Sequence, residues 1–148
     1  MRVVFTIFCL LLSASGEARS VPLPQKDVEA LLARGLDGVE AGSAARAVLF
    51  HGLLVEVDPN GSTLTTEHRI ERVLTVAGGK ELAVLWLGYD PSSNEVTPLS
   101  VRTHRKGGEI VEIDPAAAQD VPRLLHHIYW PFRALAVQLP RVHPRDWV

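Results

Sequence analysis

Six histidines are the residues of this chain best suited to bind a metal ion, and their spacing argues against that role. Zinc sites take ligands at short fixed spacings, such as two histidines one helical turn apart. None of the six forms such a pair, and two adjacent histidines project in different directions on a strand or a helix. We therefore expect no metal site and interpret as surface or interface residues His51, His68, His104, His126, His127 and His143.

Nucleophilic and acid–base chemistry also lack a recognisable motif. The sequence contains no Gly-x-Ser-x-Gly elbow and no His-Glu-x-x-His helix, and its single cysteine, Cys9, lies in an apolar run. A carboxylate pair about 5 to 10 Å apart, as glycosidases require, leaves no sequence pattern. We therefore predict no catalytic residue, no metal ligand and no bound cofactor, and we expect no enzymatic activity from this chain.

Two clusters have a binding interpretation beside a structural one. The aromatic run Tyr129–Phe132, together with Trp147, is interpreted as a core corner, and if exposed it would form a platform for a ligand or partner. Four basic residues gather near a predicted hairpin tip, where solvated charges are the simpler interpretation and anion binding is the alternative. They are Arg102, His104, Arg105 and Lys106.

The N-terminal residues have the layout of a secretory signal peptide. Arg2 supplies a positive start, Val3–Leu12 is a short apolar run, and small residues follow up to Ala18. The run is too short to span a bilayer, which takes about 20 apolar residues. We expect cleavage after Ser15 or Ala18 and a periplasmic or extracellular location. The alternative of a lipid anchor at Cys9 is disfavoured, because leucines follow that cysteine.

Composition points to one globular domain after the signal. About 130 residues remain, which is one domain's length, and 47% of the whole chain is hydrophobic. The net charge of -2, from 15 basic and 17 acidic residues, gives no sign of a nucleic-acid partner. No second long apolar segment follows, so no transmembrane helix is expected. The predicted divisions are a signal at 1–18, a lead-in with a short helix at 19–44 and an incomplete β domain at 45–148.

The pattern after the lead-in predicts a mainly β, antiparallel, sandwich-like fold. A short helix is expected over Gln25–Arg34, where Val28, Leu31 and Leu32 have helical spacing, and another helical turn over Ala41–Arg46. Turn residues predict hairpins at Asp58–Gly61 and Lys106–Gly108. The flanking runs predict strands at 47–57, 63–76, 82–89, 96–105, 109–113 and 134–139, and the start of another at 145–148.

Strand alternation also predicts the core. In the strand 63–76 the even positions are the more apolar, so that face is expected to be buried. Asn60-Gly61-Ser62 matches the glycosylation sequon, but the turn itself explains the Asn-Gly pair. The core is predicted to contain Leu64, Ile70, Leu74, Leu85, Val101, Ile110, Leu135, Val137 and Leu139.

The order of these pieces resembles the domain of unknown function 3857. The resemblance covers about Ala45 to Val148, and its most specific part is the Leu-Pro…Pro-x-Asp segment near the end. Arg141 and Arg145 stand where the family often has glycine, a residue that would suit a tight turn. The likeness rests on the charged strand 67–74, the segment 99–103, the Gly107-Gly108 hairpin, Tyr129, Arg133, and the segments 137–140 and 142–146.

The resemblance implies an all-β companion domain that precedes a transglutaminase-like domain in exported bacterial proteins. The catalytic residues of such a neighbour would lie downstream, and we expect the β domain to continue past Val148. The leading interpretation is therefore a non-catalytic binding or scaffolding module, whose partner is that downstream domain. The alternatives are a separate interaction protein that docks an envelope protein or peptide through a sheet edge, and a small hydrolase with an unrecognised site.

Overall fold

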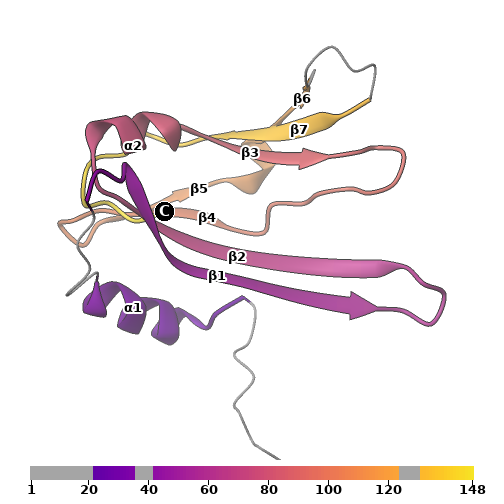
Figure 1. Ribbon diagram of the computed structural model, residues 1–148, viewed down its shortest axis with the longest axis horizontal. Coiled ribbons are helices and arrows are strands. Elements are labelled where there is room, and N and C mark those ends of the chain that lie inside the picture. The colour runs from indigo at the N-terminus through magenta and orange to yellow at the C-terminus, as the bar shows by residue number, and fades with distance from the viewer. Residues whose placement is uncertain (1–21, 36–41, 124–130) are drawn as a thin grey trace, which may run out of the picture.

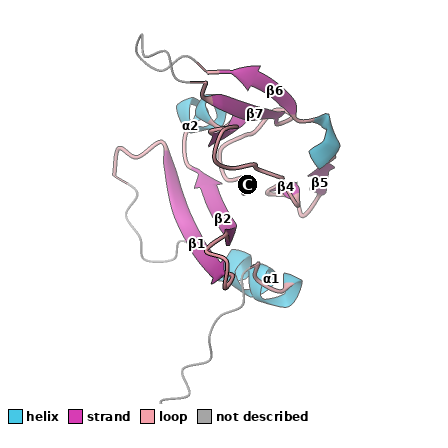
Figure 2. Cartoon of the chain, turned by 90° about the vertical axis from the view of Figure 1, so that its right-hand side faces the viewer, coloured by secondary structure: helices cyan, strands magenta, loops and turns pink. Residues whose placement is uncertain are grey.

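The computed structural model describes residues 22–35, 42–123 and 131–148, and the predicted signal peptide lies outside them. Two antiparallel sheets face each other, and helix α1 packs against the outer side of the first (Figures 1 and 2). The elements are α1 Gln25–Arg34, β1 Arg46–Val57, β2 Thr63–Val73, α2 Val76–Glu81, β3 Val84–Tyr89, β4 Val101–His104, β5 Ile110–Ile113, the 3-10 helix η1 Pro115–Ala117, β6 Gln119–Pro122 and β7 Arg133–Gln138.

The first sheet consists of two hairpins that the last residues of the chain connect. β1 pairs with β2 and β4 pairs with β5, while Trp147 forms antiparallel bridges to Arg72 of β2 and His104 of β4. The second sheet has the order β3-β7-β6 and is antiparallel throughout. The predicted mainly β, antiparallel fold is therefore confirmed, as are the hairpins at 58–61 and 106–108.

Two apolar clusters hold these layers together. The larger lies between the sheets, and Leu85, Ile113 and Val148 pack against it. The second lies under α1, where Val28 of the helix meets Ile70 of β2 and Trp147. The buried members of the first cluster are Val73, Leu82, Val101, Val137 and Leu139, and those of the second are Leu23, Val28, Ile70 and Trp147.

A hydrogen bond just before helix α1 ties it to β2. The N–H of Leu23, just before the helix, donates to Nδ1 of His68 at 3.0 Å. Asp27 in the first turn and Arg34 in the last suit the helix dipole, and the helix ends at Gly35, whose φ is 60°. The predicted helix is thus confirmed, and neither helix of the described residues is long and apolar enough to cross a membrane.

Three local predictions are wrong. The strand expected over 96–105 is reduced to β4, Val101–His104, and residues 96–100 form no strand. β2 ends at Val73, and residues 76–81 form α2, which begins because the hydroxyl of Thr75 accepts the N–H of Gly78 at 3.1 Å. A Cβ on Gly78 would collide with the carbonyl oxygen of Ala45, so this glycine allows a close approach of two backbone segments. The helical turn expected at 41–46 is a turn at 42–43 in the described residues, and β1 begins at Arg46.

The core prediction is right near the middle of the molecule and wrong at its ends. Ile70, Val101, Val137 and Leu139 are buried, and Leu74, Leu85 and Leu135 are half-buried. Leu64 is 64% exposed, because the far end of the β1–β2 hairpin extends beyond the other strands (Figure 1). Ile110, beside the tip of the β4–β5 hairpin, is 51% exposed.

The buried face of β4 yields a stability prediction. Thr103 is fully buried between the sheets, and its hydroxyl has no hydrogen-bond partner among the described residues. Thr103→Val keeps the shape and removes this hydroxyl, so the free energy of unfolding should rise by about 1 kcal/mol in urea titrations. The control Thr103→Ser keeps the hydroxyl and loses a methyl, and should lower it by about 1 kcal/mol. A less stable valine variant would contradict this prediction.

Candidate functional site

Residues Asp146–Val148, here called the seam strand, lie between β2 and β4 and pair with both. Toward β2, the N–H of Glu71 donates to the backbone oxygen of Val148 at 2.6 Å, and the N–H of Val148 donates to the carbonyl oxygen of Glu71 at 2.8 Å. Toward β4, His104 and Trp147 exchange two bonds of 2.8 and 2.9 Å. The strand predicted over 145–148 is therefore present from Asp146, whereas Arg145 belongs to the turn before it, and this strand makes one sheet of two hairpins.

A tight turn leads into the seam strand. The N–H of Asp146 donates to the oxygen of His143 at 3.0 Å, and Pro144 and Arg145 are the two central residues. The φ of Arg145 is 78°, which is the value required at the third position of a type II turn and which glycine adopts freely. Arg145 is the one non-glycine residue with positive φ in the described part of the chain. The turn thus forms without the glycine that the family often has there.

The carboxylate of Asp146 ties the turn to the tip of the β4–β5 hairpin. It accepts a 2.6 Å bond from Nη1 of Arg105, a 2.9 Å bond from the N–H of His143 and a 3.3 Å bond from the N–H of Lys106. Burial by itself would raise the pKa of Asp146, but these hydrogen bonds outweigh it and hold that pKa below its usual value. The carboxylate is 4% exposed and is therefore a buried charge with a complete set of donors.

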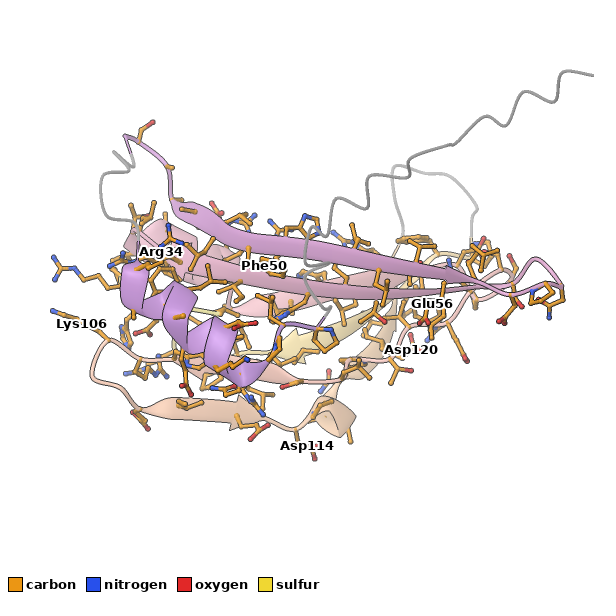
Figure 3. All side chains as sticks on the ribbon, turned by 90° about the horizontal axis from the view of Figure 1, so that it is seen from below. Arg34, Phe50, Glu56, Lys106, Asp114 and Asp120 are labelled. Atoms are coloured by element: carbon orange, nitrogen blue, oxygen red, sulfur yellow. The ribbon has the colours of Figure 1, made fainter. Side chains whose placement is uncertain are left out.

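An open hollow of about 450 Å³ lies beside this turn, between the end of α1 and the hairpin tip. We call it the basic hollow, because five of its lining residues are cationic. Figure 3 shows two of them, Arg34 and Lys106, at the same end of the molecule. Its lining consists of Leu32, Ala33, Arg34, Gly35, Arg72, Arg105, Lys106, Arg145 and Trp147.

The cations of the hollow have few negative partners. Arg105 is paired with Asp146, and its Nη1 also donates to the carbonyl oxygen of Arg141. The guanidinium of Arg72 lies over the ring of Trp147, 4.7 Å from its centroid, and its buried Nε has no hydrogen-bond partner in the described residues. Among these residues, no carboxylate forms an ion pair with Arg34, Arg72, Lys106 or Arg145.

The described histidines lie apart, each with its own surroundings. Nε2 of His51 is 2.8 Å from Oε1 of Glu67, His143 lies in the turn, and burial lowers the pKa of His68. Burial and then Arg102 lower the pKa of His104, whereas Glu29 raises it. Within the described ranges, no three acidic, histidine or cysteine residues gather as metal ligands. His126 and His127 lie outside these ranges.

The two clusters singled out in the sequence are divided in the structure. Trp147 is buried under α1, Phe132 packs near Gly88 of the second sheet, and Tyr129 and Trp130 lie outside the described residues. Of the basic tip, Arg105 and Lys106 line the hollow.

The other two residues of the tip have different surroundings. Arg102 binds Glu112 and Gln25, and His104 bonds with Trp147 through its backbone. No sequence pattern places Arg34 and Arg72 at the hollow together with Arg145. The single signal for any of them was arginine at position 145, where the family often has glycine.

Loss of the Asp146 charge should destabilise the domain and change its acid sensitivity. A lowered pKa means that this carboxylate adds stability above the usual pKa of about 3.9 and loses that contribution as the pH falls through the folded-state value. Asp146→Asn should cost about 3 kcal/mol at pH 7, because Arg105 loses its buried partner. It should also flatten the decline in unfolding free energy below about pH 4.

Chemical denaturation between pH 7 and pH 2 provides the measurement. The control is Asp120→Asn, which removes an exposed pair with Arg133 and should change stability much less. Equal effects of the two variants at pH 7 would show that Asp146 does not hold the turn.

The strain at Arg145 yields a prediction of the opposite sign. Arg145→Gly should raise the free energy of unfolding by about 0.5–1 kcal/mol, because relief of the left-handed backbone exceeds the extra entropy of glycine in the unfolded chain. The control Arg141→Gly, at a position whose φ is not positive, should lower stability. Thermal melting of the two variants tests both signs, and a destabilised Arg145→Gly would refute the strain.

Comparison with known proteins identifies a family. The matching residues include the seam strand and most of the residues that line the hollow. Residues 59–148 match the family described as a Domain of Unknown Function, DUF3857. No curated protein and no solved structure matches the chain. β1 and α1 precede the matched residues, so the α1 wall of the hollow lies outside the match. Because the match spans more than half of the sequence, this chain belongs to the DUF3857 family of domains of unknown function.

Proposed function

We propose that this chain is a non-catalytic binding or scaffolding domain of an exported protein and that it precedes a transglutaminase-like, peptidase-like domain. The signal-like residues 1–18 support export. The resemblance of residues 45–148 to the family implies the neighbouring domain. The seam in the first sheet supports the scaffolding role, and it is the observation that carries the proposal.

The seam is longer than the strand that fills it. Backbone groups of alternate residues point to the same edge of a strand, and those of Glu71 face the seam strand. The backbone N–H and C=O of Arg69 and Glu67 therefore face the same seam, and in the described part of the chain they have no partner across it. By the same alternation Arg102 of β4 faces the seam from the opposite side, because His104 bonds with Trp147.

Where Trp147 pairs with both β2 and β4, the seam is one strand wide. Neighbouring strands lie about 4.8 Å apart, so the seam strand holds β2 and β4 about two spacings apart. α1 covers the outer side of this region, where Gln25 accepts a bond from Arg102 and Leu23 donates one to His68. A polypeptide that entered the seam would gain main-chain hydrogen bonds on both edges, which is the usual basis of strand addition.

The occupant that we propose is the polypeptide that follows the seam strand in the full protein. Such a continuous strand would fix the direction in which the chain leaves the β domain, and hence the position of a catalytic neighbour. The β domain would act as a rigid base for that neighbour and would contribute no reacting group. In this arrangement, stability of the β domain and placement of the neighbour depend on the same hydrogen bonds.

Amide hydrogen exchange tests this proposal. The chain is compared with a longer form that includes the next hundred or so residues of the gene product. In the longer form the amides of Glu67, Arg69 and Arg102 should become as protected as those of Glu71 and His104, which serve as internal controls because their bonds are present in both forms. The longer form should also melt at a higher temperature, since more backbone is paired.

Three outcomes would overturn the proposal. One is rapid exchange of those three amides in the longer form. Another is their protection by an added envelope peptide and not by the following polypeptide, which would instead support a separate docking protein. The last is turnover of a peptide, amide, ester or glycoside by this chain that a single side-chain substitution abolishes.

A further inference from the structure

The basic hollow concentrates positive charge in a chain that is negative overall. Arg34, Arg72, Arg105, Lys106 and Arg145 line it, whereas the whole chain has 15 basic and 17 acidic residues. The nearby carboxylate of Asp146 is already bound by Arg105 and by two backbone N–H groups. A concave surface with an excess of one charge raises the local concentration of the opposite ion.

The geometry points to a binding site for a phosphate group in this hollow, and we propose that the domain uses it to bind a phosphate-bearing anion. The ligand chemistry is a phosphate with one or two negative charges, carried by a soluble ester or by a lipid headgroup. Arginine suits this ligand, because its planar guanidinium donates two parallel hydrogen bonds to phosphate oxygens. The proposal does not depend on what occupies the seam.

Two of the arginines are held in place before any ligand arrives. Arg72 is stacked on Trp147, and Trp147 itself is buried and bonded to β4 through its backbone. Arg105 is fixed by its bond to Asp146 and is 18% exposed. Side chains that are already ordered lose little freedom on binding, which favours affinity. The buried Nε of Arg72 has no hydrogen-bond partner among the described residues. A buried donor without a partner lowers stability, so the position of this cation at the hollow is destabilising by itself.

Arg145 is the most specific indication of function. Its backbone has a φ of 78°, which glycine would adopt without strain, yet the residue is an arginine that lines the hollow. Strain of this kind persists where the surrounding structure compensates for it, and it occurs often at binding sites. Glycine at this position would satisfy the turn and remove a cation from the hollow. The arginine therefore fits a binding role better than a structural one.

The shape of the hollow limits what the ligand can be. A volume of about 450 Å³ lies within the range of small-molecule sites. Its apolar lining is confined to Leu32, Ala33 and the stacked Trp147, so an apolar ligand would find little surface to cover. The hollow is open to solvent, which suits a charged group that stays partly hydrated. A phosphate group with a polar remainder matches these features.

The test titrates the chain with inorganic phosphate and pyrophosphate by calorimetry and follows the Trp147 indole signal by NMR. Binding should weaken about tenfold in Arg145→Gly, in Arg34→Gln and in Lys106→Gln, the loss expected for one charge-assisted hydrogen bond. Arg145→Lys keeps the charge and loses the second parallel hydrogen bond, so its affinity should lie between those of the parent chain and of Arg145→Gly. The control Arg123→Gln removes a cation that stacks on Trp86 of the second sheet and should bind like the parent chain. Raising the salt concentration should weaken binding.

The Arg145→Gly variant separates binding from folding. A purely structural arginine would change stability and anion affinity in the same direction, whereas we expect this variant to be more stable and to bind more weakly. Vesicles of phosphatidylglycerol, with phosphatidylcholine vesicles as the control, distinguish the two sources of phosphate. Capture by the anionic vesicles that the three charge-removing variants abolish would identify a lipid headgroup, and binding of soluble anions without capture would identify a soluble ester.

Two results would overturn the site. One is the absence of heat and of any shift of the Trp147 signal with either anion up to about 10 mM, a concentration well above those at which specific sites fill. The other is binding that Arg145→Gly, Arg34→Gln and Lys106→Gln leave unchanged, which would place the anion elsewhere. Neither result bears on hydrogen exchange in the seam, so failure of this site and failure of the proposed function are distinguishable.

Discussion

The pairing of the seam strand with both β2 and β4 is the interaction on which the rest of this structure depends. Trp147 and its neighbours exchange backbone bonds with Glu71 on one side and His104 on the other. In the described residues, no other strand connects the β1–β2 hairpin to the β4–β5 hairpin within the first sheet. A few main-chain hydrogen bonds thus join two hairpins into one sheet, and that sheet faces the sheet of β3, β7 and β6.

The same segment also builds the candidate site. Trp147 is buried under α1 with Ile70 and stacks with Arg72. Asp146 fixes Arg105, and the turn before it places Arg145 at the hollow. Folding of the first sheet and assembly of the basic hollow are therefore one event, since both need the seam strand in register. A change that loosens this strand would affect the stability of the domain and the arrangement of its cations together.

Several local costs are concentrated around this segment. Arg145 has a backbone conformation that suits glycine, and Asp146 is a buried charge. The Nε of Arg72 and the hydroxyl of Thr103 are buried and find no hydrogen-bond partner within the described ranges. Each costs stability by itself, and only the charge of Asp146 is compensated by a full set of donors. Two of the uncompensated features belong to residues that line the hollow. Stability and binding therefore compete there, a balance that is common at functional sites.

Sequence by itself determined the fold class, because strand alternation and turn residues act over short distances. Local patterns correctly predicted the turns at Asn60-Gly61 and Gly107-Gly108 and the helix at 25–34. They also correctly predicted the burial of Ile70 and Val137. It failed at Leu64, at the far end of the β1–β2 hairpin, and at Ile110, which pairs with His104 on the face of β5 opposite to Ile113. It also missed α2, which Thr75 caps and whose Gly78 lies against the backbone of Ala45. The hollow combines α1, β2, a hairpin tip and the last turn, so only tertiary packing brought together Arg34, Arg72, Lys106 and Arg145.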